Sequence, residues 1–283
     1  MSNLTSKNFI RQLLAEYGIY PKKHLGQNFL TDAHVLAKIV AAAEISKDDL
    51  VIEIGPGLGV LTAELAKCAA NVVAIEIDTK LSEILEQTVA KEFANVRILR
   101  EDILKADVGG IIAASGFASA KIVANLPYYI TAPVIFGLLE QKLPITAMVV
   151  MVQKEVADRF LAAAGTKAYG IPTLSLAYYG KAALIANVPP HSFHPRPDVY
   201  SAVIKIEINP RRDINSKIFF PLIRAAFANR RKTLANCLSA NLNLTKEQAA
   251  ALIQEAGLPP TIRGEALNFS DFERLSEIME RMI

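Results

Sequence analysis

The feature that most limits the fold is the alternation of short apolar runs with helical patterns along the first half of the chain. Such runs, rich in β-branched residues, are typical of fully buried strands. Helical patterns such as "TKLSEILEQTVAKEF" separate them. Strands that alternate with helices form mostly parallel sheets that are covered on both faces. The expected strands are residues 50–54, 71–77, 95–99, 121–125 and 146–152.

The chain changes character after this alternation. Two strand-like runs, "KAALIANV" (181–188) and "YSAVIKIEI" (200–208), follow each other closely, which predicts an antiparallel edge on the sheet. From about Asn209 onward the pattern is only helical. We therefore expect an α/β fold in residues 1–209: a Rossmann-like, doubly wound, mostly parallel sheet preceded by an N-terminal helical arm. Residues 210–283 are expected to form a small all-helical domain.

The N-terminal segment and the cysteines argue against several classes of protein. The segment "MSNLTSKNFIRQLLAEYG" lacks the apolar core and the cleavage site of a signal peptide. Apolar runs such as "ITAMVVMV" are far shorter than the roughly 20 residues that a membrane span needs. Cys68 and Cys237 lie far apart without a C-x-x-C motif, which argues against a disulfide framework or a cysteine zinc site. We expect a cytoplasmic protein that does not contact membranes.

The net charge of +3 is distributed unevenly along the chain. The balance of Lys and Arg over Asp and Glu is +3 for residues 1–30, −4 for 31–180, +7 for 181–232 and −3 for 233–283. Basic side chains that contact phosphates release counterions and supply most of the non-specific affinity for nucleic acids. A single charge run is often only a solvated face. Two basic segments that flank an acidic one favour RNA or DNA as the partner.

Glycines and polar residues follow the expected strands at the edge where doubly wound sheets bind ligands. Gly55, Gly57 and Gly59 come directly after the first strand, where a backbone without Cβ can turn tightly and approach a ligand. Their G-x-G-x-G spacing differs from the dinucleotide G-x-G-x-x-G motif, which disfavours a nicotinamide-dependent enzyme. Carboxylates at this edge are pure acceptors, suited to a ribose diol or an amine. The polar residues that end the next strands are Glu76, Asp102 and Asn125.

The glycine turn, the two acids and "NLPY" (125–128) together resemble S-adenosylmethionine-dependent methyltransferases that modify an exocyclic amino group. Three further stretches narrow the resemblance: "HLGQNFL" (24–30), "SFHPRPDVYSAV" (192–203) and "AFANRRKTLANCL" (226–238). With them, essentially the whole chain is similar to the KsgA-type ribosomal RNA small-subunit adenine dimethyltransferases. The glycine turn and "QNF" also occur in the large-subunit RNA methyltransferases that confer macrolide resistance, so that family is an alternative.

The resemblance implies a site for S-adenosylmethionine, which becomes S-adenosylhomocysteine. In that family the "QNFL" segment contacts the cofactor, the glycine turn lies under its methionine portion, one acid binds the ribose and the next binds the adenine amine. Carried onto this chain, the expected cofactor-binding residues are Asn28, Leu30, Gly55, Gly57, Glu76, Asp102 and Asn125.

The segment "NLPY" is expected to hold the adenine that receives the methyl group. Adenine's exocyclic amine is a poor nucleophile because its lone pair is delocalised into the ring, and accepting a hydrogen bond from the amine localises that pair. The Asn125 side-chain oxygen can accept one N–H. Pro127 keeps Leu126 extended and has no N–H of its own, which leaves the local carbonyls free. Tyr128 offers a ring on which a flipped base can stack, and Phe193 matches the family's second stacking residue.

Other residues near these motifs receive plainer interpretations. Tyr129 is interpreted as packing. Asp102 is assigned no proton transfer, because an amine becomes acidic once it is alkylated and no general base is obligatory. His191 and His194 lack a clear third ligand, so no metal is expected.

The expected partner is small-subunit ribosomal RNA within a precursor of the 30S particle, and the protein is expected to act as a monomer. Two adjacent adenines of the 3'-terminal hairpin would become dimethylated, coupled to late subunit assembly. A role mainly as an assembly or RNA-binding factor is a second possibility. The basic residues expected to contact RNA are Lys22, Lys23, Arg196, Arg230, Arg231 and Lys232.

Overall fold

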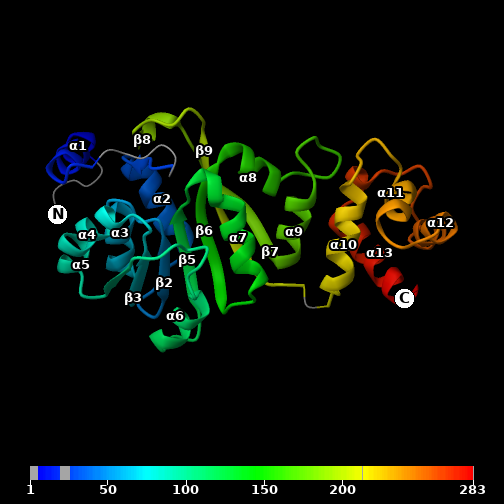
Figure 1. The fold of residues 1–283 in the computed structure, drawn as a ribbon, viewed down its shortest axis with the longest axis horizontal. Coiled ribbons are helices and arrows are strands. Elements are labelled where there is room, and N and C mark those ends of the chain that lie inside the picture. Colours follow the sequence, from blue (N-terminus) through cyan, green and yellow to red (C-terminus); the bar gives the residue numbers. More distant parts are fainter. Residues whose placement is uncertain (1–5, 20–25, 212, 283) are drawn as a thin grey trace. The chain divides into compact units, whose positions relative to one another are not determined.

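The computed structural model describes residues 6–19, 26–211 and 213–282. It contains a seven-stranded sheet in the order β4-β3-β2-β5-β6-β9-β7 (Figure 1). Strands β2 to β6 pair in parallel, whereas β9 pairs antiparallel with β6. The expected doubly wound sheet with an antiparallel edge is therefore confirmed. The strands are β2 (Leu50–Ile54), β3 (Asn71–Ile75), β4 (Val96–Leu99), β5 (Ala120–Asn125), β6 (Ile145–Gln153), β7 (Gly180–Val188) and β9 (Ser201–Ile208).

Both faces of the sheet are buried, which explains the continuous apolar runs of its strands. Val51, Val123 and Val149 belong to one core cluster together with apolar residues of helices α2 and α3. Their neighbours in sequence, Ile52 and Ile122, point to the opposite face and are also buried. The helices of this part of the chain are α1 (Lys7–Glu16), α2 (Ala33–Ala43), α3 (Val60–Cys68), α4 (Thr79–Gln87), α5 (Val89–Glu92), α6 (Val108–Ser115), α7 (Thr131–Glu140) and α8 (Lys154–Phe160).

The segment 79–93, which reads as one helix in the sequence, forms two. Thr88 leaves the helical region, with φ −111° and ψ −83°, and its hydroxyl donates a 2.6 Å hydrogen bond to the Ile84 carbonyl. Such back-bonding by threonine competes with the helical hydrogen bonds and bends the chain. Helix α4 therefore ends at Gln87, and the short α5 begins at Val89.

A small ribbon joins two segments that are distant in sequence. Strand β1 (Phe29–Leu30) pairs antiparallel with β8 (Phe193–His194), with Leu30 opposite Phe193. The "QNFL" segment and the proline-rich loop, two of the motifs on which the family resemblance depends, are thus in direct contact. A 3-10 turn, η3 (Pro190–Ser192), leads into β8.

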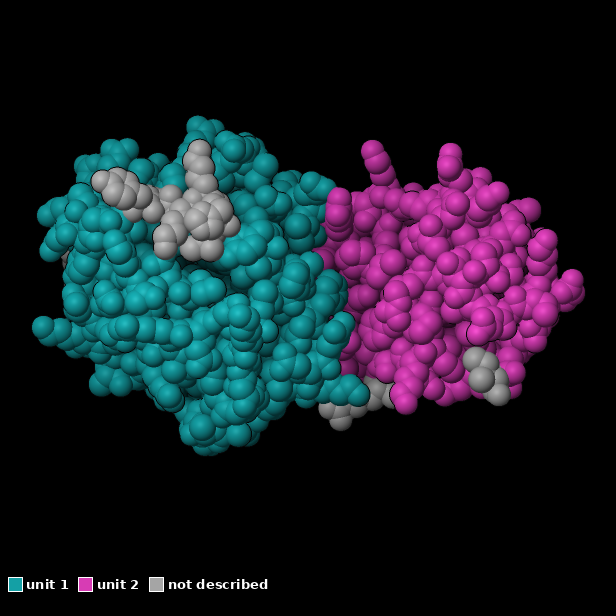
Figure 2. Space-filling model, viewed as in Figure 1, with its two compact units in different colours: residues 1–157, 183–208 teal, residues 158–182, 209–283 magenta. Residues whose placement is uncertain are grey.

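The chain divides into two compact units (Figure 2). The first contains residues 1–157 and 183–208, and the second contains 158–182 and 209–283. The helices of the second unit are α9 (Ile171–Tyr179), α10 (Ser216–Phe227), α11 (Leu234–Asn241), α12 (Lys246–Glu255) and α13 (Phe269–Met282), with the 3-10 turn η4 (Gly264–Ala266). Among the described residues, no helix is long and apolar enough to span a membrane.

The second unit thus includes a segment that the expected division, 1–209 and 210–283, placed in the first domain. Helix α9 groups with the C-terminal helices because Tyr178 and Tyr179 pack on α10. The Tyr178 ring lies 5.4 Å from that of Phe219 and 4.9 Å from that of Phe220, between ring centroids. Aromatic contacts of this kind add to the free energy of burial.

Gly59, at the start of α3, has no room for a side chain. Its φ is +78°, and an added Cβ would lie 2.5 Å from Val89 Cγ2 and 2.7 Å from Leu85 Cδ2. Gly116, which ends α6, has a similar φ of +77° but open space around it. We expect Gly116→Ala to cost about 1 kcal/mol from backbone strain alone. Gly59→Ala should cost about 2 to 4 kcal/mol, because the clash adds to that strain.

Melting midpoints or urea titrations of the two variants measure this difference. Equal losses of stability in Gly59→Ala and Gly116→Ala would contradict this prediction. They would show that Leu85 and Val89 can move away from the added methyl group without loss of stability.

Candidate active site

The carboxyl ends of β2, β3 and β5 surround a cavity of about 170 Å³. It lies where the strand order reverses, since β2 has β3 on one side and β5 on the other. Ligands of doubly wound sheets bind at such a switch point. The cavity brings together most of the residues expected at the site: Asn28, Leu30, Gly55, Gly57, Glu76, Asp102, Asn125 and Pro127.

Glu76 is fixed at the end of β3 by two backbone donors. Its Oε2 accepts a 3.2 Å hydrogen bond from the Gly57 N–H, and its Oε1 accepts a 2.9 Å bond from the Asp78 N–H. Its side chain is buried, and this desolvation raises the pKa of the carboxyl above its usual range. A carboxylate held in this way keeps further lone pairs for a diol or another donor in the cavity.

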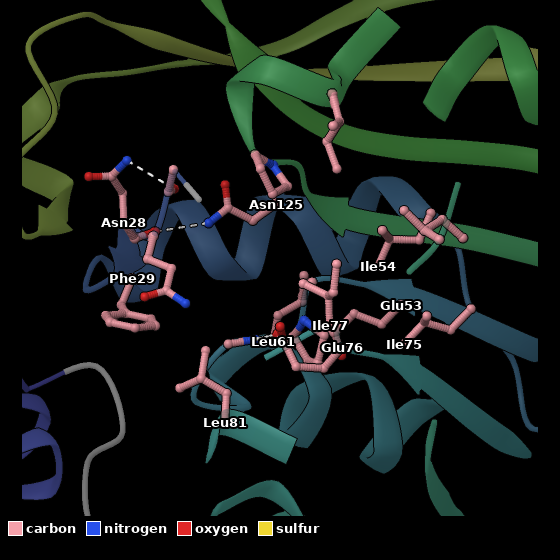
Figure 3. A pocket seen from close by; sticks show the side chains of 18 of the residues that line it. Asn28, Phe29, Glu53, Ile54, Leu61, Ile75, Glu76, Ile77, Leu81 and Asn125 are labelled. Atoms are coloured by element: carbon pink, nitrogen blue, oxygen red, sulfur yellow. Dashed lines mark hydrogen bonds between the residues drawn. The ribbon is translucent and has the colours of Figure 1, made fainter. Parts of the chain in front are cut away.

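Asn125, the last residue of β5, is oriented by the "QNFL" segment. Its Nδ2 donates a 3.2 Å hydrogen bond to the backbone carbonyl of Asn28. The side-chain Nδ2 of Asn28 donates in turn to the backbone carbonyl of Gly26, also at 3.2 Å (Figure 3). Because the amide nitrogen is used in this contact, Oδ1 remains as the acceptor that Asn125 offers to a ligand.

The backbone after Asn125 also presents an acceptor. Leu126 extends the sheet by donating its N–H to the Met151 carbonyl at 3.1 Å, and its side chain is buried. Within the described ranges, no hydrogen bond reaches the Leu126 carbonyl oxygen. Pro127 follows in extended geometry, and its carbonyl accepts from Ile130 N–H and the Thr131 hydroxyl as the chain enters η2 (Tyr128–Ile130).

The two tyrosines of η2 differ in their surroundings. Tyr128 is partly buried and lies outside the cavity lining, with its hydroxyl 2.7 Å from Ser201 Oγ. Tyr129 lines the cavity with 54% of its surface exposed. Burial and the nearby carboxylates of Asp102 and Glu76 raise the pKa of the Tyr129 phenol. The interpretation of Tyr129 as a packing residue is therefore wrong.

Phe193 lies in the core and not at the cavity. Only 2% of its surface is exposed, and it belongs to the same core cluster as residues of α2 and α3, while its backbone pairs with Leu30. Its ring has no open face for a base in this structure, so a stacking role stays a prediction.

Glu53 is a site residue that the sequence-based reasoning missed. Its side chain lines the cavity, yet only 1% of its surface is exposed. Its Oε2 and the hydroxyl of the buried Thr62 have no hydrogen-bond partner among the described residues. Burial raises the pKa of Glu53 to about 8, with a further contribution from the neighbouring Glu76. The signal was visible in "LVIEI", where one acid interrupts a fully buried strand.

The residues expected to bind RNA lie elsewhere. Arg196, Arg230, Arg231 and Lys232 are exposed and do not line the cavity. Lys22 and Lys23 fall outside the described residues. Within the described parts of the chain, no group of three or more His, Cys, Asp or Glu side chains could hold a metal ion.

Comparison with known proteins identifies the family. The family model described as ribosomal RNA adenine dimethylase matches residues 20–278. The chain belongs to the ribosomal RNA adenine dimethylase family. It is 49% identical over 275 residues to ribosomal RNA small subunit methyltransferase A of Lachnoclostridium phytofermentans, covering 95% of each chain. Its counterpart from Geobacillus thermodenitrificans is 47% identical over 278 residues, which cover 95% of this chain and 94% of the relative.

Solved structures agree with this membership. A dimethyladenosine transferase from Plasmodium falciparum has a TM-score of 0.78 at 27% identity, with 89% of this chain and 98% of that chain covered. The 23S rRNA methyltransferase ErmE has a TM-score of 0.71 at 23% identity, covering 89% and 100%, which is a likeness of fold. For this ribosomal RNA adenine dimethylase, the family, the Rossmann-like fold and the enzyme class expected from the sequence are confirmed.

Glu53 predicts a pH dependence of the stability of the unliganded protein. The pKa of Glu53 is about 8 in the folded protein and 4.5 for an unperturbed carboxyl, so between these values the folded state holds a proton that the unfolded chain has released. Stability therefore falls as the pH rises through this window. Glu53→Gln stays neutral, and we expect it to melt higher than wild type at about pH 8 and to be similar near pH 4.

Melting midpoints across this pH range, measured without ligand, provide the test. The exposed Glu140→Gln on α7 serves as the control and should follow wild type. A Glu53→Gln curve parallel to that of wild type would contradict a buried, protonated Glu53.

Proposed function

We propose that the protein transfers methyl groups from S-adenosylmethionine to the N6 amines of two adjacent adenines in the 3'-terminal hairpin of small-subunit ribosomal RNA. The products would be dimethyladenines and S-adenosylhomocysteine. The observation that carries the choice of substrate is the 44–49% identity, over nearly the whole chain, to relatives named small subunit methyltransferase A. The likeness to the large-subunit enzyme, at 23% identity, extends to the fold alone.

The cavity fits a cofactor that carries positive charge next to a nucleoside. Glu53 supports this most directly, because a buried carboxyl oxygen without a partner, such as its Oε2, is costly unless a ligand compensates it. S-adenosylmethionine supplies an electrophilic methyl group on a sulfonium and also carries an ammonium group. We assign Glu53 to the cationic methionine portion, Glu76 to the ribose hydroxyls and Asp102 to the adenine amine. Asn28, Leu30, Gly55 and Gly57 complete this site.

Asp102 has the geometry for such a contact. Its Oδ1 accepts a 3.0 Å hydrogen bond from the Leu104 N–H, which holds the carboxylate at the cavity. A fixed acceptor of this kind can bind an amine without taking part in proton transfer.

Asn125 and Leu126 would activate the target amine. The Asn125 Oδ1 and the Leu126 carbonyl are two acceptors for its N–H groups, and hydrogen bonds to them localise the nitrogen lone pair. Both acceptors are held by the sheet, so they need little reorganisation when the substrate binds. Alignment of nucleophile and methyl donor supplies much of the rate enhancement. Tyr128 is proposed to stack on the flipped base.

The proposed function also concerns the oligomeric state of the protein, its location and the particle on which it acts. We propose that the protein works as a monomer in the cytoplasm, on a precursor of the small ribosomal subunit, and that modification is coupled to late assembly. If it were mainly an assembly factor, loss of methyl transfer would leave its contribution intact.

Asn125→Ala separates catalysis from binding. Purified wild type with methyl-labelled S-adenosylmethionine should label unmodified small subunits at the two adenines, as mapped by primer extension. Asn125→Ala should lose about 100-fold or more in kcat, because an acceptor made only for the reacting amine is gone. Its affinity for subunits should be unchanged. Asn8→Ala, an exposed asparagine of α1, is the matched control.

No labelling by wild type would refute the proposed activity. Equal losses of transfer and of subunit binding in Asn125→Ala would refute the separate role of this residue.

The two tyrosines are expected to affect different substrates. Tyr128→Ala should raise the KM for RNA and lower kcat/KM by about 10- to 100-fold, since stacking on a base contributes about 1–3 kcal/mol. Tyr128→Phe should retain most activity, because it loses only the contact with Ser201. Tyr129→Ala should raise the KM for S-adenosylmethionine, because Tyr129 shares its cavity with Glu76 and Asp102. Steady-state kinetics with each substrate varied measures both effects. A higher KM for S-adenosylmethionine in Tyr128→Ala, or a higher KM for RNA in Tyr129→Ala, would contradict these assignments.

A further inference from the structure

Arg230 is occupied within the second unit. Its Nη1 donates to the Lys167 carbonyl at 2.8 Å, and its Nη2 donates to the carbonyls of Tyr169 at 2.7 Å and Thr166 at 3.5 Å. Its Nε lies 3.1 Å from Glu265 Oε2. A guanidinium has five N–H donors in a fixed fork. Three carbonyls and one carboxylate use most of them, so little of Arg230 is left for a phosphate.

The segment that Arg230 holds, the loop 163–169, is also fixed at other points. The Gly165 N–H donates to the Glu265 carbonyl at 2.8 Å, and the Tyr169 hydroxyl donates to the Leu267 carbonyl at 2.7 Å. The buried Tyr169 ring packs edge-on against Phe227 of α10, 5.9 Å between centroids. The loop 163–169 is therefore attached to Arg230, to the end of α10 and to the chain around η4.

This attachment brings the backbone of Lys167 to the guanidinium of Arg230, the residue that directly precedes Arg231 and Lys232 in the chain. Lys167 is exposed, as are Arg231 and Lys232, which directly follow Arg230 in the chain. The nearest acid in this network, Glu265, is already paired with Arg230. Within the described residues, none of Lys167, Arg231 and Lys232 forms an ion pair. Like charges gathered without counter-charges repel each other unless a polyanion compensates them.

We propose that Lys167, Arg231 and Lys232 form one contact surface for RNA phosphates, and that Arg230 is the positioning residue that fixes this surface rather than a phosphate ligand. The proposal rests on the proposed function only in taking RNA as the substrate. It revises the expectation from the sequence, which grouped Arg230 with the phosphate-binding residues and did not include Lys167.

Salt-dependent binding of the full-length protein to transcribed small-subunit ribosomal RNA tests the surface. We expect Lys167→Ala, Arg231→Ala and Lys232→Ala each to weaken affinity about three- to tenfold at about 100 mM salt. Each should also flatten the slope of log K against log salt by about 0.7 to 0.9, the value for one lost phosphate contact. Lys246→Ala, an exposed lysine of α12 in the same unit, is the matched control and should change neither quantity.

Arg230→Lys tests the positioning role. It keeps the positive charge, but an ammonium cannot replace a fork that reaches three carbonyls and a carboxylate. We expect it to weaken RNA binding about as much as Lys167→Ala does, and the double variant Arg230→Lys with Lys167→Ala should be no weaker than either single variant. Arg230→Lys combined with Arg231→Ala should instead be weaker than both singles.

Several results would overturn the proposal. If Arg230→Lys bound RNA with wild-type affinity, Arg230 would have no positioning role. If its loss of affinity added to that of Lys167→Ala, Arg230 would be an independent phosphate ligand. An unchanged salt slope in Lys167→Ala would remove the loop from the surface, and this variant disturbs none of the hydrogen bonds that hold the loop. Methyl transfer by wild type, measured on the same preparation, is independent of these outcomes and reports on the proposed function.

Discussion

The site depends on the cost of burying carboxyl groups at the ends of two neighbouring strands. Glu53 lies in β2 next to its last residue, Glu76 directly follows β3, and the strand ends Ile54 and Ile75 are paired in register. Two backbone N–H groups stabilise Glu76, whereas the Oε2 of Glu53 has no hydrogen-bond partner among the described residues. An uncompensated acid at this depth reduces stability. Such a cost is typical of functional sites, where a ligand supplies the missing partner.

The other side of the cavity is organised by the amide of Asn125. This side chain links the end of β5 to the "QNFL" segment, which is in turn paired with β8 through Leu30 and Phe193. The "QNFL" segment, the end of β5 and strand β8 lie far apart in the sequence. Together they set the position of the Asn125 side-chain oxygen. The burial of Phe193 follows from the same arrangement, because the ring anchors the ribbon to the core beneath it.

The sequence predicts the sheet and much of the cavity because both follow from local patterns. Strand runs, the glycine turn and the polar residues at strand ends are fixed by periodicity and by the geometry of parallel sheets. Glu53 was within reach of the same reasoning, since it interrupts an apolar run. Tyr129 and Arg230 were not, because their surroundings depend on contacts such as that of Arg230 with Glu265, which no local pattern reveals. The grouping of α9 with α10 has the same origin in the packing of Tyr178 on Phe219.

The second unit is assembled from two separate stretches, 158–182 and 209–283, interrupted by two strands of the sheet. Truncation after residue 208 would therefore not yield an intact catalytic half, because α9 would keep Tyr178 and Tyr179 but lose the aromatic rings against which they pack. A chimera with another member of the family faces the same restriction. To exchange the helical unit cleanly, both stretches must be transplanted together.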